Sequence, residues 1–90
     1  MKISFDPTKR EKTLRERDLD FEHAAEVFEG LTFTQRDQRR DYPEMRYQTY
    51  GLLKGRLVMV VWTYRFEARH IVSMRKCNDR EKARFTSQLG

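Results

Sequence analysis

Apolar and polar residues alternate with different periods along the chain, and each period predicts a different element. Residues 3–5 read as a short strand or an extended lead. Asp6 and Pro7 are residue types that cap and begin helices, which predicts a charged, peripheral helix over residues 7–17. A second helix follows Asp20, its predicted N-cap. Its apolar stripe has helical spacing and consists of Phe21, Ala24, Ala25 and Phe28.

The second half of the chain has the period of strands. Residues 31–35 and 45–51 alternate apolar and polar side chains, as half-buried strands do, with a charged loop over 36–43 between them. Residues 56–65 are apolar on both faces, which predicts the central strand of a sheet. Residues 69–75 follow after a tight connection and form its hairpin partner.

A last helix is predicted to follow these strands. Asn78 and Glu81 have the spacing of a capping box, and Phe85 and Leu89 are its apolar anchors. Ninety residues are enough for one domain, residues 1–90. The order of elements predicts an α+β fold in which an antiparallel sheet packs against two N-terminal helices and a C-terminal helix.

Charge is unevenly distributed along the chain. Residues 1–30 hold 6 Lys and Arg against 8 Asp and Glu, whereas residues 31–90 hold 13 against 6. A basic segment of this kind is typical of proteins that bind nucleic acid. The alternative is that the charge only keeps a small protein in solution.

Other sequence signals exclude several classes of protein. Cys77 is the single cysteine, so no internal disulfide forms, and no His and Cys residues have metal-ligand spacing. We therefore expect neither a metal nor another cofactor. No apolar run approaches the roughly 20 residues of a membrane span. The N-terminus has no signal-peptide pattern, which predicts a cytoplasmic protein without a membrane partner.

Arginines lie at the C-terminal ends of the two long predicted strands. Arg65 ends the first, and Arg75 lies beside Lys76 at the end of the second. Guanidinium groups held by a rigid sheet are suited to bind phosphate. Arg46 comes from a neighbouring strand and would complete the cluster. The alternative for each arginine is a surface ion pair with a nearby acid such as Glu44 or Asp41.

Several motifs occur in order along almost the whole chain: Phe5-Asp6-Pro7, Leu19-Asp20-Phe21, Arg46-Tyr47, Gly55-Arg56, Val60-Val61-x-Thr63-x-Arg65 and Ile71-Val72-Ser73-Met74-Arg75-Lys76. Together they resemble the BrnT family, the toxins of bacterial type II toxin–antitoxin pairs. The resemblance implies a RelE-like fold and a ribonuclease that arrests translation. It also implies a BrnA-like antitoxin of the ribbon-helix-helix type, expected to form a heterotetramer with the toxin and to contact DNA itself.

The chain departs from the family pattern at three places. Glu16-Arg17-Asp18 stands where members often have Lys-His-Gly, and Arg17 cannot replace a histidine as a proton carrier. Arg65-Phe66 replaces Arg-Gly, and His70 stands where an arginine is common. These departures keep two alternatives open. One is a nucleic-acid-binding module without catalysis, and the other is a basic domain that binds an acidic protein.

The expected chemistry is metal-independent cleavage of RNA by its own 2′-hydroxyl. Preorganised guanidinium groups would position the phosphate and stabilise the pentavalent species. We therefore predict Arg46, Arg65, Arg75 and Lys76 as catalytic residues, with Lys76 as a further charge or a base. The residues predicted to bind RNA are Arg69, Arg80, Arg84, Tyr50 and Tyr64. For Arg80 and Arg84 a plain solvated helix face is the alternative.

His70 is the histidine near this predicted cluster, and histidine is the usual acid–base residue near neutral pH. Strict strand alternation places it on the face of Val72 and Met74, opposite Arg69 and Arg75. On this pattern His70 points away from a cleft lined by the arginines. It is therefore predicted only as a secondary acid–base candidate.

Overall fold

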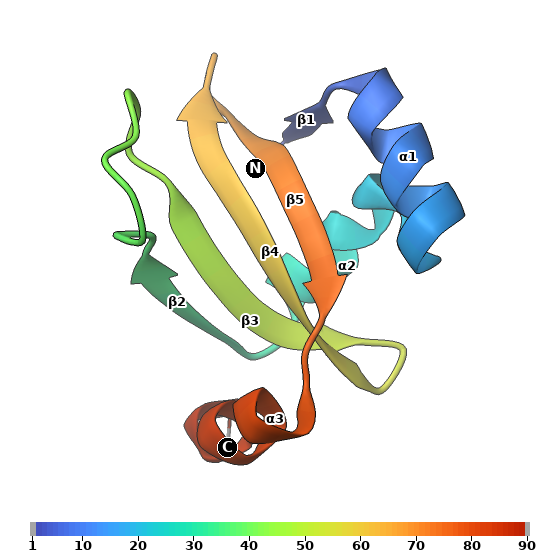
Figure 1. Cartoon of the computed structure of the whole chain (residues 1–90), viewed down its shortest axis with the longest axis vertical. Coiled ribbons are helices and arrows are strands. Elements are labelled where there is room, and N and C mark those ends of the chain that lie inside the picture. The colour runs from blue at the N-terminus through green and yellow to red at the C-terminus, as the bar shows by residue number, and fades with distance from the viewer. Residues whose placement is uncertain (1, 90) are drawn as a thin grey trace.

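The computed structural model describes residues 2–89, except for the side chain of Leu89, and it has the predicted α+β class (Figure 1). Two 3₁₀ turns occur at Phe21–His23 and Thr86–Leu89. The helices and strands are β1 (Ile3–Phe5), α1 (Pro7–Arg17), α2 (Ala24–Glu29), β2 (Thr32–Arg36), β3 (Tyr47–Leu53), β4 (Arg56–Arg65), β5 (Ala68–Lys76) and α3 (Asp79–Phe85).

Five strands form one sheet in the order β1-β5-β4-β3-β2. The predicted central strand is confirmed as β4, because its residues Leu57 to Thr63 are buried on both faces. Strands β2 to β5 are antiparallel neighbours, as predicted. β1 adds to the edge of β5 in parallel, so the sheet is mostly, not wholly, antiparallel.

α1 makes polar contacts with the 3₁₀ turn that follows it and with β5. Asp6 caps the helix and Asp18 ends it in the left-handed conformation, with φ 55°. No residue of α1 is buried, which confirms its peripheral place. Arg10 donates two hydrogen bonds, of 2.8 and 2.9 Å, to the carboxylate of Asp20. Arg17 donates at 2.8 Å to the Met74 carbonyl, on the edge of β5 that the short β1 leaves open.

α2 lies behind the sheet and covers its main core (Figure 1). Phe21 and Val27 are fully buried there against the central strands. The approach is close at Gly51 of β3, where an added Cβ would lie 2.8 Å from a Val27 methyl carbon. Glycine at this position therefore sets the distance between α2 and the sheet.

α3 covers one end of the opposite face. Its predicted capping box is present, since Asn78 and Glu81 each accept a hydrogen bond from the other's backbone N–H. The ring of Phe85 stacks on Tyr50 with centroids 3.9 Å apart. Arg75 of β5 donates two hydrogen bonds of 2.7 Å to the Glu81 carboxylate, which attaches the helix to the sheet. The predicted anchor at Leu89 lies outside the described side chains.

A bulge in β5 changes the faces that strict alternation assigns. Ser73 pairs with Val61 and Ile71 with Trp62, so one extra residue of β5 lies between these pairs. His70 pairs with Thr63 and Arg75 with Met59, and these two residues of β4 share a face. His70 and Arg75 therefore lie on the same face. The predicted separation of these two side chains is wrong, because the alternation was taken as unbroken.

The same bulge moves Arg69 away from Arg75. The Arg69 guanidinium lies over the Phe28 ring of α2, at 4.2 Å from its centroid, and also near Trp62. Arg69 therefore faces the helix side of the sheet. The prediction that Arg69 and Arg75 share one face of β5 is also wrong.

We predict that Gly51→Ala lowers the free energy of unfolding by about 1–3 kcal/mol, because the added methyl forces α2 away from β3. Urea unfolding measures the effect. Gly30→Ala is the matched control, since its Cβ would meet only the Val27 carbonyl oxygen at 3.8 Å. Equal stability of the two variants would contradict the close approach.

Glu81→Gln tests the attachment of α3. Hydrogen bonds from Arg75 lower the pKa of Glu81 from 4.5 to about 2. The contribution of the Arg75–Glu81 pair to the free energy of unfolding is thus complete above about pH 4.5 and disappears as the pH falls towards 2. We expect the variant to lose about 1–2 kcal/mol at neutral pH, an amount reduced by solvent around Arg75. Urea unfolding near pH 2 should show a much smaller difference, whereas a constant difference would contradict the attachment.

Candidate functional site

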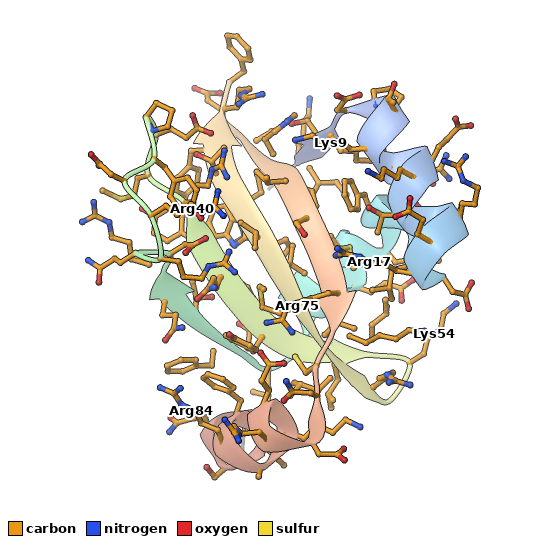
Figure 2. The ribbon with its side chains drawn as sticks, in the orientation of Figure 1. Lys9, Arg17, Arg40, Lys54, Arg75 and Arg84 are labelled. Carbon is orange, nitrogen blue, oxygen red and sulfur yellow. The ribbon has the colours of Figure 1, made fainter. Side chains whose placement is uncertain are left out.

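The sheet face opposite α2 is covered by α3 at one end and is open at the other (Figure 1). α1 flanks this open part, and its basic side chains extend beside β5, with Lys9 and Arg17 at its two ends (Figure 2). A groove of about 160 Å³ lies between the helix and the strand. Its lining consists of Lys9, Lys12, Thr13, Glu16, Arg17, Val72 and Ser73.

His70 lies half-buried on this open face, in the part of β5 that pairs with β1. Its Nδ1 is 3.0 Å from the hydroxyl oxygen of Ser4, the facing residue on β1. This contact orients the ring. Burial lowers the pKa of His70 below 6.5, and the positive charges of Arg65 and Lys9 lower it further. A histidine of this kind is neutral at physiological pH and able to accept a proton.

Two of the predicted catalytic arginines do lie together. Arg46 and Arg65 approach the same carboxylate oxygen of Glu44, at 3.4 and 3.9 Å. The Arg46 guanidinium also lies 4.3 Å from the centre of the Tyr42 ring. Pairing with Glu44 was the alternative for these arginines, and it holds in this structure. The contacts are long and partly exposed, so they leave both guanidinium groups able to bind an anion.

The other two predicted catalytic residues lie elsewhere. Arg75 is on the open face but at its α3 end, where both of its terminal nitrogens are engaged by Glu81 (Figure 2). Lys76 lines a pocket of about 330 Å³ with Asp18 and His23. The fold thus divides the predicted set among three places.

The residues predicted to bind RNA are also dispersed. Arg80 and Arg84 are exposed on α3. Tyr64 is 55% exposed and meets Trp62 edge-on, with ring centroids 4.9 Å apart. Tyr50 is 4% exposed and stacks against Phe85, so no free face of its ring remains for a base. Arg69 lies on the helix side, as described above.

Sequence reasoning predicted a charged loop over residues 36–43 but selected no functional residue from it. The segment between β2 and β3 holds three arginines and, with Arg36 of β2, borders a cavity of about 500 Å³. Its fold depends on Asp37, a fully buried carboxylate that accepts two hydrogen bonds of 2.8 Å from Arg39. Arg36 and Arg40 remain at the cavity rim. The density of arginine in this short segment was the available signal.

Sequence reasoning also missed the contribution of α1. Lys9 and Lys12 are three residues apart and therefore share one helix face, which lines the groove beside β5. The spacing of the two lysines is visible in the sequence. Which face of α1 lines the groove is decided only by the packing of the helix against β5.

Two further findings concern metals and membranes. Within residues 2–89, no group of three or more His, Cys, Asp and Glu side chains has an arrangement able to hold a metal ion. In the same part of the chain, no helix is long and apolar enough to cross a membrane.

Comparison with known proteins agrees with the motif pattern. Residues 5–81 match the family model described as the ribonuclease toxin BrnT of type II toxin–antitoxin systems. A comparison with curated proteins gives no match. The family match covers most of the chain and includes strands β2 to β5 and both N-terminal helices. The chain therefore belongs to the BrnT family of ribonuclease toxins, whose substrate is RNA and whose partner is an antitoxin.

Proposed function

We propose that this chain cleaves RNA at the open face of the sheet by attack of a 2′-hydroxyl on the adjacent phosphorus, without a metal. The observation that carries the proposal is the position of His70. Its ring is oriented by Ser4 and kept neutral by burial and by the charges of Arg65 and Lys9. Family membership supplies the class of substrate.

Each group near His70 has a task in this reaction. The neutral imidazole accepts the proton of the attacking 2′-hydroxyl. As the 2′ oxygen bonds to phosphorus, the bond from phosphorus to the 5′ oxygen breaks, which leaves a 2′,3′-cyclic phosphate and a 5′ oxygen that takes a proton from water. Arg65 and Arg46 bind the scissile phosphate and stabilise the charge that develops on its oxygens. Lys9 and Lys12 hold the RNA backbone along the groove beside α1. Binding of the phosphate displaces Glu44 from its long contacts with the two arginines.

The remaining predicted residues serve outside the chemical step. Arg75 positions α3 through Glu81, so its loss would act through the fold. Lys76 opens into a pocket on the other face. Arg80 and Arg84, exposed on α3, extend the basic surface for RNA beyond the cleft.

We further propose that a BrnA-like antitoxin of the ribbon-helix-helix type covers this cleft. Carboxylates of the antitoxin would complement the basic residues 31–90 and exclude RNA. Two toxins and two antitoxins would form a heterotetramer, in which DNA is contacted through the antitoxin alone.

A second function, RNA binding without cleavage, is favoured by one observation. Arg17 stands where a histidine is common in the family, and its guanidinium is engaged by the Met74 carbonyl. In that case the groove binds RNA but leaves it intact. Incubation of the pure protein with RNA in EDTA separates the two functions.

We predict that His70→Gln reduces RNA cleavage in EDTA by about 10²–10⁴-fold, because the general base is lost. The pH profile of kcat/KM is a second readout. In the native protein activity should rise as His70 loses its proton, with a midpoint below pH 6.5 because the pKa is lowered. The variant should lack this rise.

The control for that experiment is His23→Gln, on the other side of the sheet and in the pocket that contains Lys76. It should keep both the rate and the pH profile. A folded His70→Gln variant with native rates would remove His70 from the mechanism.

We also predict that RNA affinity falls steeply as salt rises, because the basic groups release counterions from the phosphates. Arg65→Ala should reduce the slope of log K against log salt by roughly one. Arg56→Ala, beside the pocket on the opposite face, should leave the slope unchanged. Fluorescence anisotropy of labelled RNA measures both slopes, and an affinity independent of salt would contradict the RNA-binding surface.

A further inference from the structure

The turn between β4 and β5 presents an aromatic side chain to solvent. Phe66 is 97% exposed, the highest exposure among the large hydrophobic side chains that the structure describes. The turn lies at the far end of the sheet from α3 (Figure 1). At this exposure nearly the whole phenyl ring is available to a binding partner.

The backbone at this turn is also strained. Phe66 has φ 51° and Glu67 has φ 62°, so two consecutive residues with side chains adopt the left-handed conformation. Two-residue hairpin turns of this kind favour Asn-Gly, because bulky residues are disfavoured at positive φ. The turn between β3 and β4 obeys this preference with Gly55 at its second position. The β4–β5 turn therefore carries Phe66 against the local preference of the backbone.

The tip is connected to the candidate site by the hairpin itself. Arg65 pairs with Ala68 at the base of the turn. Thr63, two residues before Arg65 and farther from the turn, pairs with His70. At about 3.3 Å per residue, Phe66 is roughly 10 Å along the strand from the level of His70. Arg65 lies between them, with a side chain 46% exposed. The order along the hairpin is therefore aromatic ring, guanidinium and imidazole.

We infer that Phe66 is a stacking residue for an unpaired RNA base near the scissile phosphate. This inference rests on the proposed function. The reacting phosphate lies at His70, Arg46 and Arg65, so the adjacent nucleotide on one side extends towards the tip. The base that follows stacks on the Phe66 ring. Such stacking is tolerant of sequence, because every base has an aromatic face. The tight turn holds the Cα of Phe66 at the tip of the hairpin, so the ring extends into solvent.

Phe66→Asn separates stability from binding, because Asn tolerates positive φ and suits this turn. We expect the melting temperature to stay equal or rise while RNA affinity falls about tenfold or more. Phe66→Trp should retain the affinity. Leu31→Asn is the matched control, since Leu31 is also an exposed apolar residue, at 73%, and its loss should leave RNA binding unchanged. The probe is a short single-stranded RNA with 2′-O-methyl groups, which the proposed reaction cannot cleave.

Two further readouts identify the contact as stacking. Phe66→Asn should leave the salt dependence of binding unchanged, because no phosphate contact is removed. An RNA that lacks one base at the stacked position should bind the native protein and Phe66→Asn equally well. Emission of the Trp introduced at Phe66→Trp should be quenched by the complete RNA.

The outcomes separate this inference from the function on which it rests. If the native protein does not bind the RNA, the proposed function fails and the inference fails with it. If the native protein binds RNA and Phe66→Asn binds equally well, only the inference is overturned. Unchanged RNA binding with weakened binding of the antitoxin would assign Phe66 to the protein partner instead, and would also overturn it.

Discussion

The structure depends on the pairing of β4 with a neighbour on each side. β4 is buried on both faces over most of its length, so its side chains contribute to both apolar clusters of this small protein. Its register with β5 places the site, because the bulge opposite Val61 and Trp62 turns His70 towards the open face. A regular hairpin would have turned His70 towards α2 and left the open face without an imidazole.

Outside this pairing, arginine–carboxylate pairs attach the peripheral segments to the rest of the fold. In larger domains apolar contacts usually do this. Arg10 holds α1 to the 3₁₀ turn that precedes α2, Arg39 fixes the loop after β2, and Arg75 attaches α3. Each binds a carboxylate with both of its arms at 2.7 to 2.9 Å. Bidentate pairs of this geometry are the strong ones. These arginines therefore have structural partners and are poor candidates for phosphate binding.

The arginines of the candidate site differ in this respect. Arg46 and Arg65 share one oxygen of Glu44 at 3.4 and 3.9 Å, and Arg65 is close to half exposed. A phosphodiester, whose two free oxygens share one negative charge, can compete with such contacts, whereas it could not easily displace the pairs described above. The partners of each arginine, more than its place at a strand end, thus indicate which ones are available to RNA. The same criterion brings Lys9 and Lys12 into the site, although sequence reasoning did not select them.

The sequence by itself determined the elements and the family. Capping residues such as Asp6 and Asn78 and the fully apolar β4 are local signals that the structure confirms. The predicted stripe of the second helix is confirmed in part, because Phe21, Ala24 and Phe28 pack in the core but Val27 takes the place predicted for Ala25. The composition of the site was decided only by the tertiary structure. A one-residue bulge reverses the face of every side chain on one side of it, and sequence periodicity does not reveal it. Likewise, an arginine is free or engaged according to which carboxylate the fold brings to it. Arg65 and Arg75 meet the carboxylates of Glu44 and Glu81, which belong to other segments of the chain, so the sequence predicted these two arginines but the packing assigned their partners.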